Sequence, residues 1–405
     1  MSQQDAAMAV PAVPLVAFDP ASIPDVTIRR ITRIRLTAVR PREVGRVHRS
    51  TYNPQVRVCW EEPFNLVETD SGFHPIGWCR APDEQMRRLI GKSLRTLFGP
   101  DGLVRPAYRF AGMLLWEVLG QALGQPVYVL LGARGPADVL TYDSSIYPSD
   151  MNAADPAAGD RYLIDSLRSG LSQGHKHFKL KIGRGGRYPD LVTREAGLAR
   201  DIHITWHARE YLGPDSAILV DANNEYTLEE AQRYLTEVAG ARIGWIEEPF
   251  PESMEQTGAL KHFILERGLD VAIADGEGGW AERPAESAAL LEQLVTARVL
   301  DVVQRPLRAY GFNEWLELLP LLARSGARAA PHNWGGYVVQ FHAAHLARGT
   351  GLCTYLETDI MVNPDVDATG FVRRNGLLSV PDTPGFGWRI DPDLFKWKEP
   401  VGVWD

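Results

Sequence analysis

The sequence predicts an α/β protein in which a parallel (β/α) barrel of the TIM type carries a smaller α+β domain. Three observations lead to this prediction. Strand patterns followed by helical patterns fill the first third of the chain, and eight short apolar runs then alternate with amphipathic stretches. Six of those repeats end in a charged or polar residue, as the carboxyl ends of barrel strands do in enzymes. A chain of 405 residues is long enough for both domains.

Composition limits the possible partners and the compartment. The formal net charge of -8 argues against a surface dedicated to nucleic acid or to an anionic membrane. No apolar run is long enough to cross a bilayer. The three cysteines, Cys59, Cys79 and Cys353, fit neither a zinc spacing nor a disulfide framework, so we expect a cytoplasmic protein whose partner is a small molecule.

The first 135 residues predict a tail followed by a small domain. Residues 1–25 lack a basic segment, and prolines interrupt their apolar stretch, so we expect a mobile tail and not a signal peptide. Residues 26–135 form the expected α+β domain. Alternating apolar residues open it, residues 56–79 predict two strands around an Asp-Ser-Gly turn, and residues 83–98 and 108–133 predict helices.

Residues 136–375 are expected to form the barrel. Alternating strand and helix patterns imply parallel strands joined by crossover helices. Eight repeats favour closure into a barrel, with an open doubly wound sheet as the alternative. The predicted strands are residues 139–145, 177–182, 217–222, 243–248, 271–276, 299–304, 327–332 and 353–358.

Three carboxylates follow consecutive predicted strands. Asp221, Glu247 and Glu277 are spaced by about one βα repeat each. Neighbouring carboxylates repel one another unless a cation lies between them, and Mg²⁺ is the cation that best suits oxygen ligands with open positions. We therefore predict a magnesium site on these three acids. Asp275 shares a strand face with Glu277 and could be the third ligand instead.

Two lysines lie on the second predicted strand. Lys179 and Lys181 are two residues apart, so their side chains project to the same face. Adjacent ammonium groups near a dication lower each other's pKa, which yields the neutral amine that a general base requires. We predict a catalytic role for both lysines, against the alternative of solvated lysines on an edge strand.

Other candidates lie at the ends of the remaining strands. His332 ends the seventh run, beside a Gly-Gly pair, and could act on the face of a substrate opposite the lysines. Glu357 could bind a substrate oxygen or form a salt bridge. Specificity is expected from residues 44–56 and from strand-end groups such as Tyr142 and Ser145.

The order of these motifs resembles the mandelate racemase/muconate lactonizing enzyme family of the enolase superfamily. The resemblance covers the chain from about residue 26, including a helix that is similar to the family's capping-domain signature. The matching motifs are KLK at 179–181, DAN at 221–223, EEP at 247–249, GE at 276–277 and PH at 331–332.

The resemblance implies a modified (β/α)7β barrel under a capping domain built from both chain ends, so that residues 376–405 would return to residues 26–135. It also implies Mg²⁺ on the three acids, and Lys181 and His332 as acid/base groups on opposite substrate faces. Lys179 would neutralise the substrate carboxylate and lower the pKa of Lys181, and Asn223 of the DAN motif would contact the substrate. A symmetric homo-oligomer is also implied.

The sequence departs from the family at one position. The family's histidine usually pairs with an aspartate at the end of the sixth strand, where this chain has Arg305 and Pro306. We expect Arg305 either to disfavour the charged form of His332 or to bind a second substrate carboxylate.

These residues predict a lyase that is similar to the acid-sugar dehydratases. It would take the proton beside a carboxylate and expel water from a sugar acid or another polyhydroxy carboxylate. A racemase or epimerase of a 2-hydroxy acid could use the same groups. A barrel that binds metal without catalysis is the alternative from another functional class.

Overall fold

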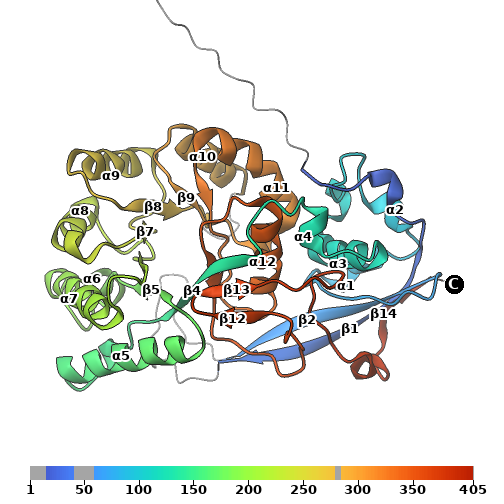
Figure 1. Ribbon diagram of the computed structural model, residues 1–405, viewed down its shortest axis with the longest axis horizontal. Coiled ribbons are helices and arrows are strands. Elements are labelled where there is room, and N and C mark those ends of the chain that lie inside the picture. The colour runs from blue at the N-terminus through green and yellow to red at the C-terminus, as the bar shows by residue number, and fades with distance from the viewer. Residues whose placement is uncertain (1–14, 41–58, 279–283, 405) are drawn as a thin grey trace, which may run out of the picture.

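The computed structural model describes residues 15–40, 59–278 and 284–404, which form two lobes (Figure 1). The first lobe holds most of residues 15–135 together with the C-terminal strand, and the second holds the predicted barrel strands and their helices. No helix within the described ranges is both long and apolar enough to span a lipid bilayer.

The smaller lobe is built on an antiparallel sheet with the order β14-β1-β2-β3. Its strands are β1 (Ile28–Val39), β2 (Cys59–Thr69), β3 (Ile76–Trp78) and β14 (Pro400–Val403). The pairing of β2 with β3 confirms the hairpin expected around the Asp-Ser-Gly turn. Residues alternate between buried and exposed along much of β1, as expected for a strand with one face on a core. Strand β14 brings the C-terminal segment beside β1.

Short helices cover this sheet. They are η1 (Pro20–Ser22), α1 (Asp83–Arg87), α2 (Leu94–Leu97), η2 (Pro106–Ala111), α3 (Gly112–Ala122) and α4 (Val127–Leu130). The single helix expected over residues 83–98 is two helices, because Gly91 between them adopts a φ of 75° that ends a right-handed helix. The boundary expected at residue 26 is also wrong, because Val16 and Ile23 are already buried against this lobe.

All eight predicted barrel strands are present. They are β4 (Asp138–Ile146), β5 (His177–Lys181), β6 (Ile218–Asp221), β7 (Trp245–Glu247), β8 (Ala272–Asp275), β9 (Val302–Val303), β10 (Arg328–Ala329) and β11 (Leu356–Thr358). Strands β4 to β10 are neighbours in chain order, and β11 pairs in parallel with β4. This order lacks the reversal of a doubly wound sheet. Just before β11, Leu352 and Thr354 form backbone hydrogen bonds with Ala329 of β10.

Crossover helices follow these strands and lie outside them (Figure 1). Four of the helices begin at a side-chain cap: α5 at Asp155, α7 at Thr193, α8 at Thr227 and α9 at Ser253. The helices are α5 (Pro156–Ser172), α6 (Arg184–Arg187), α7 (Arg194–Leu212), α8 (Leu228–Glu237), α9 (Met254–Glu266), α10 (Pro284–Thr296), α11 (Leu307–Ser325) and α12 (Val339–Thr350). The remaining elements are η3 (Ser149–Asn152), η4 (Ala239–Ala241), η5 (Pro392–Phe395), and β12 (Val372–Arg374) with β13 (Leu377–Ser379), which extend the sheet beside β4.

A layer of inward-facing side chains fills the space between the parallel strands. It consists of Tyr142, Leu219, Trp245, Ala274, Val302 and Ala330, one from each of six strands or their ends. Tyr142 and Trp245 meet edge to face, with their ring centroids 5.4 Å apart. This layer forms a solid floor, so polar side chains further along the strands gather at the carboxyl ends.

Candidate active site

Two residues after this floor, the strand ends bring acids and lysines together. The parallel register places Lys181 of β5 beside Asp221 of β6, and Asp221 beside Glu247 of β7. Because side chains at matched positions of parallel strands point to the same side, these three groups line one edge of the sheet. Lys179 lies two residues earlier on the same face of β5, as its spacing predicted.

Lys179 is at the centre of a buried network of charges. Its Nζ atom lies 2.5 Å from Oε1 of Glu247, 3.1 Å from Oε1 of Glu357 and 3.4 Å from Oδ2 of Asp221. The side chain of Lys179 is 1% exposed, and its three partners are equally buried. Lys181 donates to the same Asp221 carboxylate. The structure therefore brings five of the predicted site residues into one network of ion pairs.

The pKa of Lys179 does not follow the sequence expectation. Burial lowers this pKa, but the carboxylates of Glu247 and Glu357 outweigh the burial and raise it well above its ordinary value. The expectation that the two lysines mainly lower each other's pKa is therefore wrong for Lys179. The pattern KLK reveals the neighbouring ammonium group, but it does not reveal three carboxylates from other strands.

The carboxyl groups carry more negative charge than the two lysines balance. Burial, followed by repulsion from Asp221, raises the pKa of Glu247 to about 8 against the effect of Lys179. Burial and Asp221 likewise raise the pKa of the neighbouring Glu248 to about 7. Within the described ranges, no three His, Cys, Asp or Glu side chains are already arranged to hold a metal ion. The lysine ammonium groups contact the carboxylate oxygens instead.

Glu277 belongs to this group of acids, whereas Asp275 faces other residues. Burial raises the pKa of Glu277 well above its ordinary value, and Glu248, Glu247 and Asp221 contribute by repulsion. Burial also raises the pKa of Asp275, and the acids that add to this rise by repulsion are Glu252 and Glu248. The main causes of the two pKa shifts thus differ: Asp221 and Glu247 contribute to that of Glu277, whereas Glu252 and Glu248 contribute to that of Asp275.

His332 reaches the site from the end of β10. Its Nδ1 atom lies 3.5 Å from Oε2 of Glu277, and the residue is 9% exposed. Burial lowers the pKa of His332 to about 4, and Glu357 opposes that shift. Pro306, at the position where the family's aspartate was expected, forms a parallel bridge with His332 and offers no carboxylate. The acid that forms an ion pair with the ring is instead Glu277.

Arg305 does not take the predicted place beside His332. Its guanidinium contacts Oγ of Ser287 at 3.2 Å and the hydroxyl of Tyr310 at 3.1 Å, and its Nε atom lies 3.5 Å from Glu314. The cation of this segment that lowers the pKa of His332 is Arg308. The prediction that Arg305 meets the substrate is therefore wrong in this structure, because the side chain is buried between α10 and α11.

The other predicted substrate contacts differ in placement. Asn223 lies at the rim with a φ of 47°, and its Nδ2 donates to Glu248 at 3.0 Å. Glu357 accepts from the backbone N–H of Asn333 at 2.6 Å and from Lys179, so it forms a salt bridge in this structure. Tyr142 belongs to the layer that fills the space between the parallel strands and is fully buried, so the predicted substrate contact is wrong for this residue.

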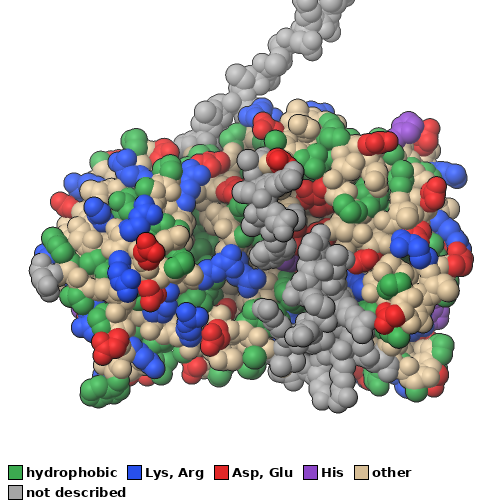
Figure 2. Space-filling model, turned by 180° about the vertical axis from the view of Figure 1, so that it is seen from behind, with side chains coloured by type: hydrophobic (Ala, Val, Ile, Leu, Met, Phe, Trp, Pro, Cys, Tyr) green, Lys and Arg blue, Asp and Glu red, His purple; other side chains and the backbone are tan. Residues whose placement is uncertain are grey.

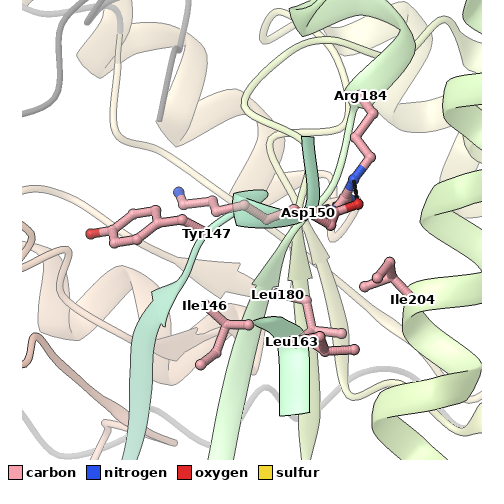
Figure 3. A pocket seen from close by; sticks show the side chains of 8 residues that line it. Ile146, Tyr147, Asp150, Leu163, Leu180, Arg184 and Ile204 are labelled. Carbon is pink, nitrogen blue, oxygen red and sulfur yellow. Dashed lines mark hydrogen bonds and ion pairs between the residues drawn. The ribbon is translucent and has the colours of Figure 1, made fainter. Parts of the chain in front are cut away.

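Sequence reasoning missed several polar groups of the site. Gln304, the last residue of the sixth run, donates from Nε2 to Oε2 of Glu247 at 2.7 Å. Its position at a strand end was the only available signal. Behind the lysines, Lys181 and Tyr147 border a cavity of about 10 Å³, the space of roughly one water molecule. Figure 3 shows Tyr147 on one side of this cavity and the Arg184–Asp150 ion pair on the other.

The smaller lobe contributes to the mouth of the site. Arg40, which follows β1, forms a buried ion pair of 2.6 Å with Asp359, which follows β11. Its guanidinium also lies 4.8 Å, 5.2 Å and 5.3 Å from the ring centres of Trp60, Tyr147 and Trp334. Figure 2 shows a hollow between the lobes on this side of the molecule, with acidic and basic side chains around it. Residues 44–56, expected to set specificity, lie outside the described residues.

Comparison with known proteins agrees with this arrangement. A model of the enolase C-terminal domain-like family matches residues 163–394, which is more than half of the chain. The chain belongs to this family. The resemblance to the enolase superfamily and its mandelate racemase branch is thereby confirmed.

Individual relatives of this enolase-family chain are enzymes of sugar acids and their lactones. A D-galactarolactone cycloisomerase from Agrobacterium fabrum is 27% identical over 351 residues, covering 83% of this chain and 85% of that protein. A mutant galacturonate dehydratase from Geobacillus sp., in complex with Mg, is 30% identical with a TM-score of 0.85 over 95% of this chain and 100% of that one. The same enzyme in complex with D-galacturonate and 5-keto-4-deoxy-D-galacturonate gives 30% identity and a TM-score of 0.83, over 93% and 99%.

Proposed function

We propose that this chain is a magnesium-dependent dehydratase of a sugar acid. One observation carries the proposal: the strand ends place two lysines, three acids of the family's ligand motifs and a histidine around a single buried network. The galacturonate dehydratase and the galactarolactone cycloisomerase support the substrate class, because both act on sugar acids or their lactones. The substrate would be a small polyhydroxy carboxylate.

The roles of the chain's own residues follow from their placement. Lys181 takes the proton next to the carboxylate, and the electron pair of that C–H bond forms a C=C bond as the β-hydroxyl leaves. His332 gives the hydroxyl a proton, so that water departs. Lys179 pairs with the substrate carboxylate, and Asn223 and Glu357 hold hydroxyl groups. The two proton-transfer groups approach from different strands, Lys181 beside Asp221 and His332 beside Glu277.

The donor set fits magnesium. Asp221, Glu247 and Glu277 offer only carboxylate oxygens, which is the ligand type that Mg²⁺ prefers. Burial and then repulsion between the acids raise the pKa values of Glu247 and Glu277, and a cation would offset that repulsion. Bound magnesium would supply fixed positive charge for the negative charge that develops on the substrate carboxylate. We assign Glu277 rather than Asp275 as the third ligand, since its neighbours are the other two acids.

The same proposal includes a closed (β/α)7β barrel under a capping domain. The backbone hydrogen bonds between Ala329 and the segment before β11, together with the pairing of β11 with β4, support closure. The pairing of β14 with β1 supports a capping domain that draws on both chain ends. The barrel would then extend over residues 136–375.

A panel of sugar acids incubated with Mg²⁺ in deuterated water tests the function. Loss of the mass of water with formation of a 2-keto-3-deoxy product is the expected result, and prior removal of Mg²⁺ should prevent it. Deuterium at the α-carbon with unchanged composition would instead show a racemase or epimerase. Neither exchange nor loss of water across the panel would indicate a barrel that binds metal without catalysis.

A further inference from the structure

The loop that carries His332 is unusually well connected to the rest of the molecule. Residues 332–338 link β10 to helix α12. Two loop residues donate to residues of the larger lobe. Asn333 donates its N–H to Glu357, and Trp334 donates from its indole nitrogen to the hydroxyl of Tyr147 at 2.7 Å. Arg308 donates to the carbonyl of Gly335. These contacts fix the side of the loop that faces the barrel.

The other side of the loop is held by the smaller lobe through Glu62 of β2. Oε1 of Glu62 accepts from the backbone N–H groups of Tyr337 at 2.7 Å and Val338 at 3.2 Å. Oε2 accepts from Nδ2 of Asn363 at 3.0 Å. The residue is 4% exposed. Burial of a carboxylate costs free energy because its charge is removed from water, and the three hydrogen bonds to Glu62 offset part of that cost.

Glu62 binds the backbone directly before the start of helix α12. Helix α12 begins after Val338, which has no side-chain oxygen to accept from the first N–H groups of the helix. The carboxylate of Glu62, from a residue 275 positions before Tyr337, accepts instead from the N–H groups of Tyr337 and of the N-cap residue Val338. A negative charge at this end of the helix is also favoured by the helix dipole. The start of α12, and thus the end of the His332 loop, depends on the other lobe.

Trp60 reinforces this contact from the same face of β2. Its ring meets that of Trp334 edge to face, with the centroids 5.2 Å apart. A Cβ atom built on Gly335 would lie 3.1 Å from Nε1 of Trp60, and Gly335 has a φ of 80°, so only glycine suits this close approach. Trp60 and Glu62 therefore grip adjacent parts of the loop.

We propose that Glu62 is a positioning residue of the smaller lobe that holds the 332–338 loop so that His332 is aligned for proton transfer. The inference rests on the proposed function, since it assigns His332 to the release of water and Lys181 to the removal of the α-proton. Glu62 acts on His332 through this loop, because its hydrogen bonds go to Tyr337, Val338 and Asn363 and not to β5. Loss of the Glu62 carboxylate should therefore slow the release of water without slowing the removal of the α-proton.

The test compares Glu62→Gln with Glu61→Gln in full-length protein. Glu61 is the neighbouring residue on the opposite face of β2, and its side chain is 66% exposed. Both oxygens of Glu62 accept hydrogen bonds. In Glu62→Gln, an NH₂ group replaces one of these oxygens and cannot accept, so a contact to Tyr337, Val338 or Asn363 is lost. Dehydration should fall by about 10–100-fold, as for other residues that orient a catalytic group. Substrate recovered from deuterated water should still acquire α-deuterium at nearly the wild-type rate.

Amide hydrogen exchange provides a readout that does not require turnover. Glu62→Gln should speed exchange in residues 333–338 while the amides of β5 keep their wild-type protection, and Glu61→Gln should change neither. Asn363→Ala removes a single donor, and should show the same pattern more weakly if Glu62→Gln folds poorly. If no sugar acid is turned over, the proposed function fails while this readout still tests the loop.

Two results would overturn the inference. Equal losses of dehydration and α-exchange, with faster amide exchange throughout both lobes, would show a general structural role. Unchanged loop exchange and unchanged dehydration in Glu62→Gln would show that the loop holds its position without this carboxylate.

Discussion

Two fully buried glutamates, one in each lobe, show what separates a functional site from structural packing. In the smaller lobe, Glu117 of α3 is 1% exposed, and it accepts from the backbone N–H of Phe386 at 2.7 Å and from the amide of Gln121. In the larger lobe, Glu247 accepts from Lys179, Gln304 and the indole of Trp245. Burial raises the pKa of Glu117 to about 7 and that of Glu247 to about 8.

The two glutamates differ in the residues that surround them and not in the direction of their pKa shifts. The hydrogen-bond donors to Glu117 are neutral, so its carboxylate serves to satisfy the buried N–H groups of Phe386 and Gln121. Glu247 shares its site with Lys179, Asp221 and Glu357, all charged and all from different strands. A raised pKa marks burial in both places, but only the convergence of several ionisable groups marks chemistry.

Removal of the metal should have the largest effect and act only on the larger lobe. Chelation of Mg²⁺, or the substitution Asp221→Asn, should lower dehydration by about 10³-fold or more, because several kcal/mol of charge stabilisation are lost. Added Mg²⁺ should restore the chelated protein but not the variant. Steady-state rates on the best sugar acid measure this. Full activity after exhaustive chelation would contradict the claim that Glu247, unlike Glu117, belongs to a metal-dependent catalytic site.

Lys181→Ala should come next. Loss of the base should lower both α-deuterium exchange and dehydration, toward the upper end of the range of about 10²–10⁴-fold for proton transfer. Lys176→Ala, just before β5 at the opposite end of the same strand, is the matched control and should stay close to wild type. Proton NMR of the α-position measures exchange. Equal exchange in Lys181→Ala and wild type would remove this lysine as the base.

His332→Asn should have a narrower effect. Dehydration should fall toward the lower end of the range of about 10²–10⁴-fold, while exchange catalysed by Lys181 continues. The expected result is recovered substrate that carries α-deuterium and little product, measured by mass spectrometry. A variant that dehydrates at the wild-type rate would show that another group protonates the leaving hydroxyl.

The periodicity of the sequence was enough to predict the strands and the acids of the site. Each of the eight apolar runs forms a strand, because short apolar segments between amphipathic helices have few other ways to bury both faces. Spacing by one βα repeat also predicted that Asp221, Glu247 and Glu277 would lie at the ends of consecutive strands, and the register places Asp221 beside Glu247. Local pattern suffices where residues are positioned by the strand on which they lie.

The rest of the site depends on contacts that no local pattern contains. Strand β9 has only two residues, so its phase could not be read, and Arg305 points between helices while Gln304 points into the site. Arg40 meets Asp359 from 319 positions away, and Glu62 meets the His332 loop across a similar separation. These partners come from the docking of the two lobes, which the sequence does not encode as a motif.

Glu117→Gln should produce the smallest effect, on stability alone. The folded-state pKa of about 7 lies above the ordinary 4.5, so the folded protein binds the proton more tightly. Ionisation therefore lowers the free energy of unfolding as the pH rises from about 4.5 to about 7, by up to about 3 kcal/mol. The variant should lose that part of the pH dependence. Urea unfolding at pH 5 and pH 8 measures it, and identical dependence in both proteins would contradict the account.

The most direct test of the magnesium site is a crystal structure grown with Mn²⁺, located by its anomalous signal. The account predicts one strong peak within about 2.2 Å of carboxylate oxygens from Asp221, Glu247 and Glu277, with the ammonium groups of Lys179 and Lys181 displaced from those oxygens. A peak bound elsewhere, or lysines that keep their ion pairs with Asp221 and Glu247 at saturating Mn²⁺, would contradict it.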